Sequence, residues 1–183
     1  MVQQLLDDHI QVIKAVKENL TQDIHRMAEI CKNSLASDGK ILFMGNGGSA
    51  ADAQHLAAEF VGRFEKERRG LPAIALTTDT SLLTAVGNDY GFDMIFSRQV
   101  EALARPGDVV VGISTSGNSP NVVKALTVAK EMGAVTVGLT GTKVGKMDGL
   151  CDLCIKVPSE KTARIQEAHI LIGHIICALV DEG

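Results

Sequence analysis

The sequence predicts an α/β fold, a doubly wound five-stranded parallel sheet flanked by helices, with an N-terminal helical extension. Short apolar runs alternate with segments whose apolar residues recur every three or four positions, as expected of strands that alternate with helices. Short β-rich runs that alternate with helices are typical of parallel strands covered on both faces. With 183 residues, 45% of them hydrophobic, we expect one domain (1–183) with right-handed crossovers.

The helical extension comes first along the chain. Apolar residues recur at spacings of three and four from Ile10 to Leu35, which predicts helix over 4–36, and Asp38-Gly39 ends it. This region (1–37) is more apolar than one sheet requires. We therefore expect it to pack on the domain and to help bury a subunit interface; packing on its own sheet alone is the alternative.

The alternation of strands and helices then fills the rest of the chain. We expect strands at 40–45, 73–77, 108–113, 134–139 and 153–157, and helices at 49–63, 80–86, 93–104, 119–132 and 162–181. Ser49 is expected to cap its helix, with Asp52 completing a weak capping box. Ser119 is followed by Pro120 at the first helical position, and Gly133 ends that helix.

Composition and charge exclude several classes of function. A net charge of −4 provides no basic surface, so nucleic-acid binding is not expected. The longest apolar run lies in Ile170–Val180 and is interrupted by Gly173 and His174, so no membrane span is expected. The N-terminus lacks the basic and long apolar regions of a signal peptide. We therefore expect a cytoplasmic protein.

The chain has four cysteines: Cys31, Cys151, Cys154 and Cys177. Cys151 and Cys154 have the spacing of a redox or metal motif, but no second such pair exists and the flanking residues have the pattern of a strand. In a cytosolic protein, this favours reduced, structural thiols.

Two Gly/Ser loops follow predicted strands and precede predicted helices. The first contains Asn46, Gly47, Gly48 and Ser49; the second contains Ser114, Thr115, Ser116 and Ser119. Neither matches a Walker A or dinucleotide-binding motif. A loop between a strand and a helix presents backbone N–H groups to an anion, and four hydroxyls add further donors. Together the loops predict a phosphorylated ligand at one edge of the sheet.

Polar side chains also interrupt two apolar helices. His55 and Glu59 share one face of an alanine-rich helix, and Gln166 and His174 lie eight residues apart on the last helix, on two levels of a predicted pocket. A carboxylate and an imidazole beside a sugar phosphate indicate acid–base transfer of a proton between adjacent carbons. The same four residues are alternatively a metal site, in which glutamine would be an unusual fourth zinc ligand.

Several blocks resemble the bacterial phosphoheptose isomerases of the sugar-isomerase (SIS) domain family, from about residue 35 to the C-terminus. They are Gly45-Asn-Gly-Gly-Ser-Ala-Ala-Asp52, Gly87-Asn-Asp-Tyr-Gly-Phe92, Phe96-Ser-Arg-Gln-Val100, Gly112-Ile-Ser-Thr-Ser-Gly-Asn-Ser119 and Arg164-Ile-Gln-Glu-Ala-His169. The resemblance implies conversion of sedoheptulose 7-phosphate to D-glycero-D-manno-heptose 7-phosphate, for the nucleotide-activated heptose of lipopolysaccharide or other surface glycans. It also implies a homotetramer with active sites at subunit interfaces.

The resemblance also assigns residue roles. It makes Glu59 and His174 the acid–base pair acting through an enediol. The phosphate would be held by Ser114, Thr115, Ser116 and Ser119, and the remaining substrate contacts would be Asn46, Gly47, Gly48, Ser49, Glu59, Arg63, Asn88, Asp89 and Gln166. Zinc, one per subunit, would be bound by His55, Glu59, Gln166 and His174, and the proton-transfer roles of Glu59 and His174 would then change. Ala163 stands where some relatives have an aspartate.

Three other functions are weighed against this one. A replication-initiator-binding relative uses the same fold as an interaction scaffold, but lacks counterparts of Glu59 and His174, which are present here. A regulatory SIS domain usually carries a DNA-binding helix-turn-helix, and the acidic segment before the first strand is too short for one. Isomerisation of another ketose phosphate, such as a hexulose, would need much the same phosphate loop.

Overall fold

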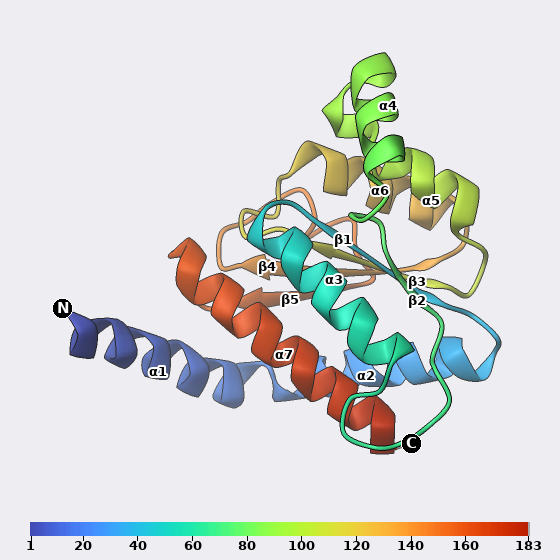
Figure 1. Cartoon of the computed structure of the whole chain (residues 1–183). Coiled ribbons are helices and arrows are strands. Elements are labelled where there is room, and N and C mark those ends of the chain that lie inside the picture. The colour runs from blue at the N-terminus through green and yellow to red at the C-terminus, as the bar shows by residue number, and fades with distance from the viewer. Residues whose placement is uncertain (183) are drawn as a thin grey trace.

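A computed structural model describes residues 1–182. The five strands form one parallel sheet in the order β2-β1-β3-β4-β5. The chain adds β2 on one side of β1 and β3 to β5 on the other, so the sheet is doubly wound and reverses direction between β1 and β3. The predicted fold class is confirmed (Figure 1).

The helices and strands have the following bounds. They are α1 (Val2–Asn19), α2 (Thr21–Ala36), β1 (Ile41–Gly45), α3 (Gly48–Val61), β2 (Ala73–Ala75), α4 (Thr80–Tyr90), the 3₁₀ turn η1 (Phe92–Met94), α5 (Ser97–Leu103), β3 (Val109–Ile113), α6 (Pro120–Glu131), β4 (Val135–Gly141), β5 (Leu153–Val157) and α7 (Thr162–Glu182).

The segment 4–36 is helical as expected, and it is divided at Leu20 into α1 and α2. Two expectations about helices need correction. The segment 93–104 is a 3₁₀ turn followed by α5. Ser49 does not cap α3, since Gly47, at φ 55°, precedes the first turn, and Asp52 forms no capping box. Ser119 and Pro120 do begin α6 as expected, and Gly133, at φ 78°, follows its end.

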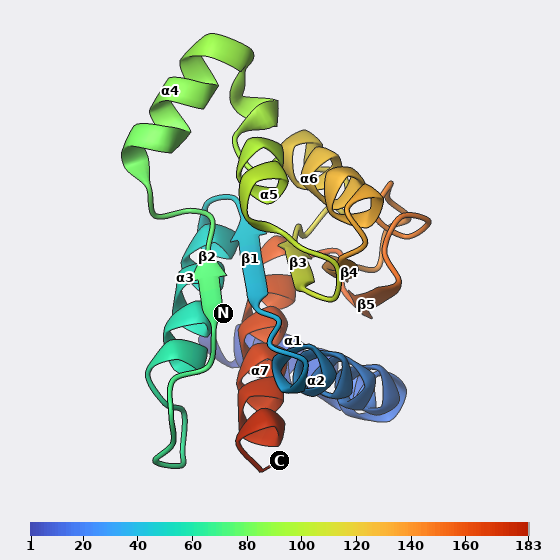
Figure 2. The same cartoon turned by 90° about the vertical axis from the view of Figure 1, so that its right-hand side faces the viewer.

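Helices cover both faces of the sheet. One apolar core joins the sheet to α2, α3 and α7, and the other joins it to α5 and α6. Strands β1 and β3 are fully buried, which explains their unbroken apolar sequences. Figure 2 shows these two layers, with α4 extending away from the sheet. Every residue of α4 is at least partly exposed.

Helix α1 also projects from the body of the protein (Figure 1). It packs on α2 and α7, yet Val2, Leu5, Leu6 and Ile10 expose from 48% to 69% of their surface. An apolar groove of about 360 Å³ lies between α1, α2 and α7. The groove and these side chains form apolar surface that a single chain leaves uncovered.

Helix α7 is long and apolar enough, by length and composition alone, to cross a membrane, contrary to the expectation from Ile170–Val180. Of its most apolar stretch, 44% is buried inside the protein. Because α7 packs against α2, α3 and the sheet, its position in the core accounts for its composition.

Candidate functional site

The two Gly/Ser loops meet where β1 and β3 end. The strands are neighbours, with Gly45 opposite Ile113, so the loops that follow them lie at the same edge of the sheet. Asn46 and Asn121 join the loops through two reciprocal amide hydrogen bonds, of 2.9 and 2.8 Å. This edge is the point at which the strand order reverses, where doubly wound sheets bind ligands.

The hydroxyl loop, Ser114–Ser119, concentrates donors at this edge. The Ser114 hydroxyl lies 2.9 Å from that of Ser119 and 3.4 Å from that of Ser116. Ser114 is buried and Ser116 is exposed. Among residues 1–182, no acceptor is found for the backbone N–H groups of Thr115, Ser116 and Ser119. Free N–H groups and hydroxyls at the start of α6 form a site suited to an anion such as phosphate.

The first loop brings Gln166 to the start of α3. A Cβ atom at Gly48 would lie 2.7 Å from the Gln166 side-chain nitrogen, so the absence of a side chain at Gly48 makes room for the amide. Gly47 and Gly48 are exposed, whereas Ser49 is only 4% exposed, beneath Gly45. Gln166 therefore belongs to the level of the two loops.

A second polar group lies further along α3 and α7. His55 Nε2 is 3.0 Å from Glu59 Oε1 and 3.3 Å from His174 Nε2. One ligand-type atom from each of these three residues lies within 4.8 Å of the others. Phe64 stacks on the His174 ring with the ring centres 5.5 Å apart. Two imidazoles and a carboxylate so arranged suit either proton transfer or a metal ion.

Close packing of α3 on α7 brings this cluster together. The helices run side by side, with Gln166 beside Gly48 and His174 beside His55. Between these levels, Leu56 packs directly on Gly173, which has no side chain to keep the helices apart. Gln166 and His174 thus lie at two different levels of the helix pair. The four expected zinc ligands are not gathered, because Gln166 lies at the loop level.

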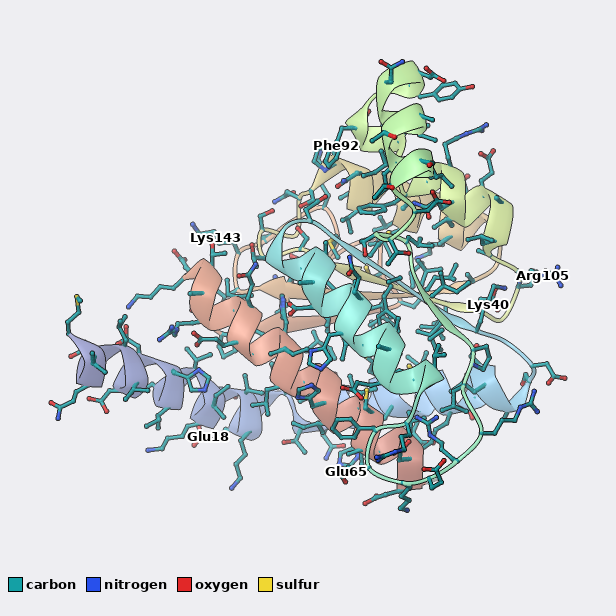
Figure 3. All side chains as sticks on the ribbon, in the orientation of Figure 1. Glu18, Lys40, Glu65, Phe92, Arg105 and Lys143 are labelled. Atoms are coloured by element: carbon teal, nitrogen blue, oxygen red, sulfur yellow. The ribbon has the colours of Figure 1, made fainter. Side chains whose placement is uncertain are left out.

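Of three other predicted residues, two lie on α4, and Arg63 lies just after α3, next in sequence to the Phe64 that stacks on His174. Asn88 and Asp89 are exposed on α4, where the Asn88 amide donates to Asp89 over 2.9 Å. Arg63 is exposed after α3 and pairs with Glu67. Figure 3 shows Phe92, beside α4, and Glu65, beside Arg63 in sequence, at opposite ends of the protein. Within one chain, Asp89 and Arg63 do not approach each other.

Sequence reasoning missed three residues near the site. Asn121 joins the loops, and Phe64 covers His174; no spacing pattern indicated either. Burial raises the pKa of the Asp52 carboxyl, and nearby His55 opposes this shift. Asp52 Oδ2 is buried and, within the described residues, has no hydrogen-bond partner. The presence of a carboxylate in an alanine-rich helix was the sequence signal that could have indicated Asp52.

Comparison with known proteins now identifies the family. The SIS domain model matches residues 4–141. The phosphoheptose isomerase of Geobacter sulfurreducens is 62% identical over 172 residues, which are 94% of this chain and 91% of that protein. The chain belongs to the phosphoheptose isomerases of the SIS domain family. Another member, from Nitratiruptor, is 56% identical over 182 residues, which are 100% of this chain and 97% of that protein.

A solved structure supports the same assignment of this isomerase to its family. The phosphoheptose isomerase of Neisseria gonorrhoeae superimposes with a TM-score of 0.94 at 48% identity, covering 100% of this chain and 97% of that chain. The similarity thus includes the helices α1 and α2, which the sequence blocks did not cover. The enzyme is a sugar-phosphate isomerase, and its substrate is a small sugar phosphate.

Proposed function

We propose that this isomerase converts sedoheptulose 7-phosphate to D-glycero-D-manno-heptose 7-phosphate in the cytoplasm, as the first step toward a nucleotide-activated heptose of surface glycans. The observation that carries the proposal is the group formed by His55, Glu59 and His174 on two parallel helices. Proton transfer between neighbouring carbons needs a carboxylate and an imidazole at one place, and a purely structural helix pair does not.

The hydroxyl loop is proposed to bind the phosphate. Ser114, Thr115, Ser116 and Ser119 offer hydroxyls around the free N–H groups at the start of α6. Asn46, Gly47, Gly48 and Ser49 border the same edge, and Gln166 reaches it from α7. These residues orient the sugar chain, with Arg63 contributing from the segment after α3 and Asn88 and Asp89 from α4.

Glu59 and His174 are proposed to move the protons. The Glu59 carboxylate takes a proton from C1 while the His174 imidazolium gives one to the carbonyl oxygen on C2, leaving an enediol. The protonated Glu59 then returns its proton to C2, and His174 takes the proton of the oxygen on C1, so a ketose becomes an aldose. His55 lies within hydrogen-bond reach of both side chains and holds their orientation.

The same cluster fits one zinc ion per subunit. Its donors are two imidazole nitrogens and a carboxylate oxygen within 4.8 Å, a set typical of catalytic zinc, which leaves one position open. When bound, zinc supplies Lewis-acid polarisation of a substrate oxygen. Glu59 and His174 then serve as ligands, so proton transfer by these atoms belongs to the metal-free state.

The distance between the two groups supports an active site shared between subunits of a homotetramer. Glu59 follows Gly48 by eleven residues, about 16 Å along α3. An extended seven-carbon sugar phosphate measures only about 9 Å from C2 to phosphorus. The separation along α3 exceeds the length of the substrate, which favours a contribution to each site from a second subunit. The exposed apolar faces of α1 and α7 offer surface for such an assembly.

The experiment that tests this function compares four proteins with sedoheptulose 7-phosphate, and detects the aldose product through a heptose kinase. Glu59→Gln and His174→Gln are expected to lose at least about 100-fold in kcat, the usual contribution of one acid–base group. Glu131→Gln, on the exposed end of α6, is the matched control and is expected to be as active as wild type. Equal activity of all four would refute the assignment.

A further variant separates phosphate binding from proton transfer. Ser116→Ala removes one exposed hydroxyl of the hydroxyl loop and is expected to raise KM about three- to tenfold with little change in kcat. An unchanged KM would exclude Ser116 from the phosphate site. A folded wild-type protein that never turns over the substrate, with or without zinc, would instead favour the non-catalytic binding scaffold.

A further inference from the structure

Cys151 and Cys154 form a second reactive group, outside the proposed active site. All four cysteines are free thiols, and these two are half-buried at the start of β5. A Cβ atom at Gly138 would lie 3.1 Å from both sulfur atoms, so the two thiols occupy the space above this glycine together. The bend at Asp152 thus brings the sulfurs of the Cys-x-x-Cys segment side by side.

The surroundings distinguish the two thiols. Cys154 Sγ lies 3.6 Å from the Thr140 hydroxyl and 3.7 Å from an Asp148 carboxylate oxygen. A hydrogen bond from the Cys151 thiol lowers the pKa of Cys154 and outweighs burial and the Asp148 carboxylate, which oppose it; the same contact, together with burial, raises the pKa of Cys151. One thiol that stabilises the thiolate of its neighbour is typical of reactive Cys-x-x-Cys pairs.

Backbone hydrogen bonds connect this pair to the hydroxyl loop. The Cys151 N–H donates to the Met147 carbonyl over 3.0 Å, and the Met147 N–H donates to the Gly117 carbonyl over 3.1 Å. Met147 Cε also lies 3.0 Å from the position of a Cβ at Gly138, beside both sulfurs. A second link joins the same two segments, because the Lys146 N–H donates to the Asn118 side chain over 3.0 Å.

We propose that Cys151 and Cys154 are a redox-active dithiol, which a peroxide oxidises to a disulfide, and that this disulfide weakens phosphate binding at the hydroxyl loop. The first part stands independently of the proposed function; the second part rests on the proposed phosphate site. Bonding the sulfurs removes the contacts of Cys154 with Thr140 and Asp148 and pulls on Cys151 and therefore on Met147. The Met147–Gly117 hydrogen bond transmits that movement to the hydroxyl loop.

The chemistry balances with one peroxide. The Cys154 thiolate attacks a peroxide oxygen, the O–O bond breaks, and a sulfenic acid and one water form. The Cys151 sulfur then attacks the Cys154 sulfur, the S–O bond breaks, and the second water leaves with the remaining thiol proton. Two thiols are oxidised to one disulfide and one hydrogen peroxide is reduced to two waters. A thiol reductant reverses the change.

The remaining two cysteines provide an internal control. Cys31 is fully buried and Cys177 is 2% exposed. Burial raises the pKa of each thiol to about 12. Neither forms an appreciable thiolate near neutral pH, so neither is expected to react with dilute peroxide in the folded protein.

The first measurement maps the thiols. The reduced full-length protein is treated with hydrogen peroxide, unfolded in an alkylating reagent and digested for mass spectrometry. Cys151 and Cys154 are expected in one peptide that is lighter by two hydrogens and not alkylated, whereas Cys31 and Cys177 are alkylated. Alkylation of all four cysteines would overturn the proposal, as would a disulfide between other partners.

The second measurement follows inorganic phosphate binding by calorimetry, which requires no turnover. Oxidation is expected to raise the Kd about three- to tenfold, the contribution of roughly one hydrogen bond, and dithiothreitol is expected to restore it. Cys151→Ser and Cys154→Ser, which cannot close the disulfide, are expected to keep the Kd of the reduced protein after peroxide. Equal Kd values for oxidised and reduced wild type would overturn the coupling.

The two parts of the proposal fail separately. If the reduced protein binds no phosphate, the coupling is overturned together with the phosphate site, while the mapping still decides the disulfide. If peroxide weakens phosphate binding equally in both serine variants, another oxidised group is responsible and the proposal is overturned.

Discussion

The contact between Gly173 and Leu56 gives a sharp test of how α3 and α7 are held together. A Cβ at Gly173 would lie 2.4 Å and 2.8 Å from the two Leu56 methyl carbons, and 3.1 Å from Leu56 Cγ. Ordinary carbon contacts lie near 3.5–4.0 Å. Leu56 is 2% exposed, so it has little free volume into which to move. Gly173→Ala must therefore displace Leu56, or α3, by about 1 Å.

Two effects oppose each other in this variant. Overpacking a buried contact costs about 1–3 kcal/mol. Replacing glycine by alanine inside a helix stabilises by about 1 kcal/mol. We expect the steric effect to win, with the free energy of unfolding lowered by about 1 kcal/mol in urea denaturation. Since His174 adjoins Gly173 and lies 3.3 Å from His55, a loss in kcat/KM should accompany it.

A matched control and a second background make the test decisive. Gly87 is inside α4, and a Cβ there meets Ile95 at an ordinary 3.8 Å, so Gly87→Ala should stabilise by up to about 1 kcal/mol. In a Leu56→Ala background the clash is absent, and Gly173→Ala should become stabilising as well. If Gly173→Ala stabilises the wild-type protein as Gly87→Ala does, the close packing of α3 on α7 is refuted.

Three further predictions concern pH and metal. Burial lowers the pKa of His169 to about 4, below its usual value near 6.5, so the folded state excludes a proton that the unfolded state binds. The free energy of unfolding should therefore fall as pH falls from about 6.5 to 4. A folded His169→Gln variant should lack this contribution. Burial would raise the pKa of Asp181, but hydrogen bonds from Arg68 and two backbone N–H groups lower it overall. The stability that the Asp181 carboxylate contributes is therefore present above the unfolded pKa near 4 and is lost in acid. The Asp181→Asn variant should show a smaller fall in Tm between neutral and acidic pH. Chelator should lower the Tm of zinc-loaded wild type and leave that of His55→Ala unchanged; equal shifts would place the metal elsewhere.

The central strands β1 and β3 were predictable because they are buried on both faces. Continuous apolar runs mark β1 and β3 to within one residue. The break at Leu20 was not predictable, since Val16, Leu20 and Ile24 keep a helical spacing across it. The cap at Ser49 was wrong because the backbone turns at Gly47, at a positive φ that a side-chain pattern does not encode.

The candidate site was predictable in its parts. Polar residues on the apolar faces of two helices were enough to nominate His55, Glu59 and His174, and the structure brings them together. Spacing along one helix does not reveal how a second helix packs beside it. The role of Gly173, which permits this packing, and that of Asn121, which joins the loops, therefore required the structure.

The separation of Gln166 from His174 leads to a last prediction, about which chains share a site. Eight residues on α7 place them about 12 Å apart along the helix, so one zinc ion cannot contact both in the same chain. If the proposed tetramer brings Gln166 of one subunit to His174 of another, two inactive variants should complement each other. Gln166→Ala and His174→Ala, unfolded together and refolded as mixed tetramers, should regain activity in about a quarter of the sites, because that fraction combines the two intact residues. Each variant refolded alone is the control. Mixed tetramers that stay as inactive as the controls would show that a site never draws these two residues from different chains, and the interfacial arrangement proposed here would be wrong.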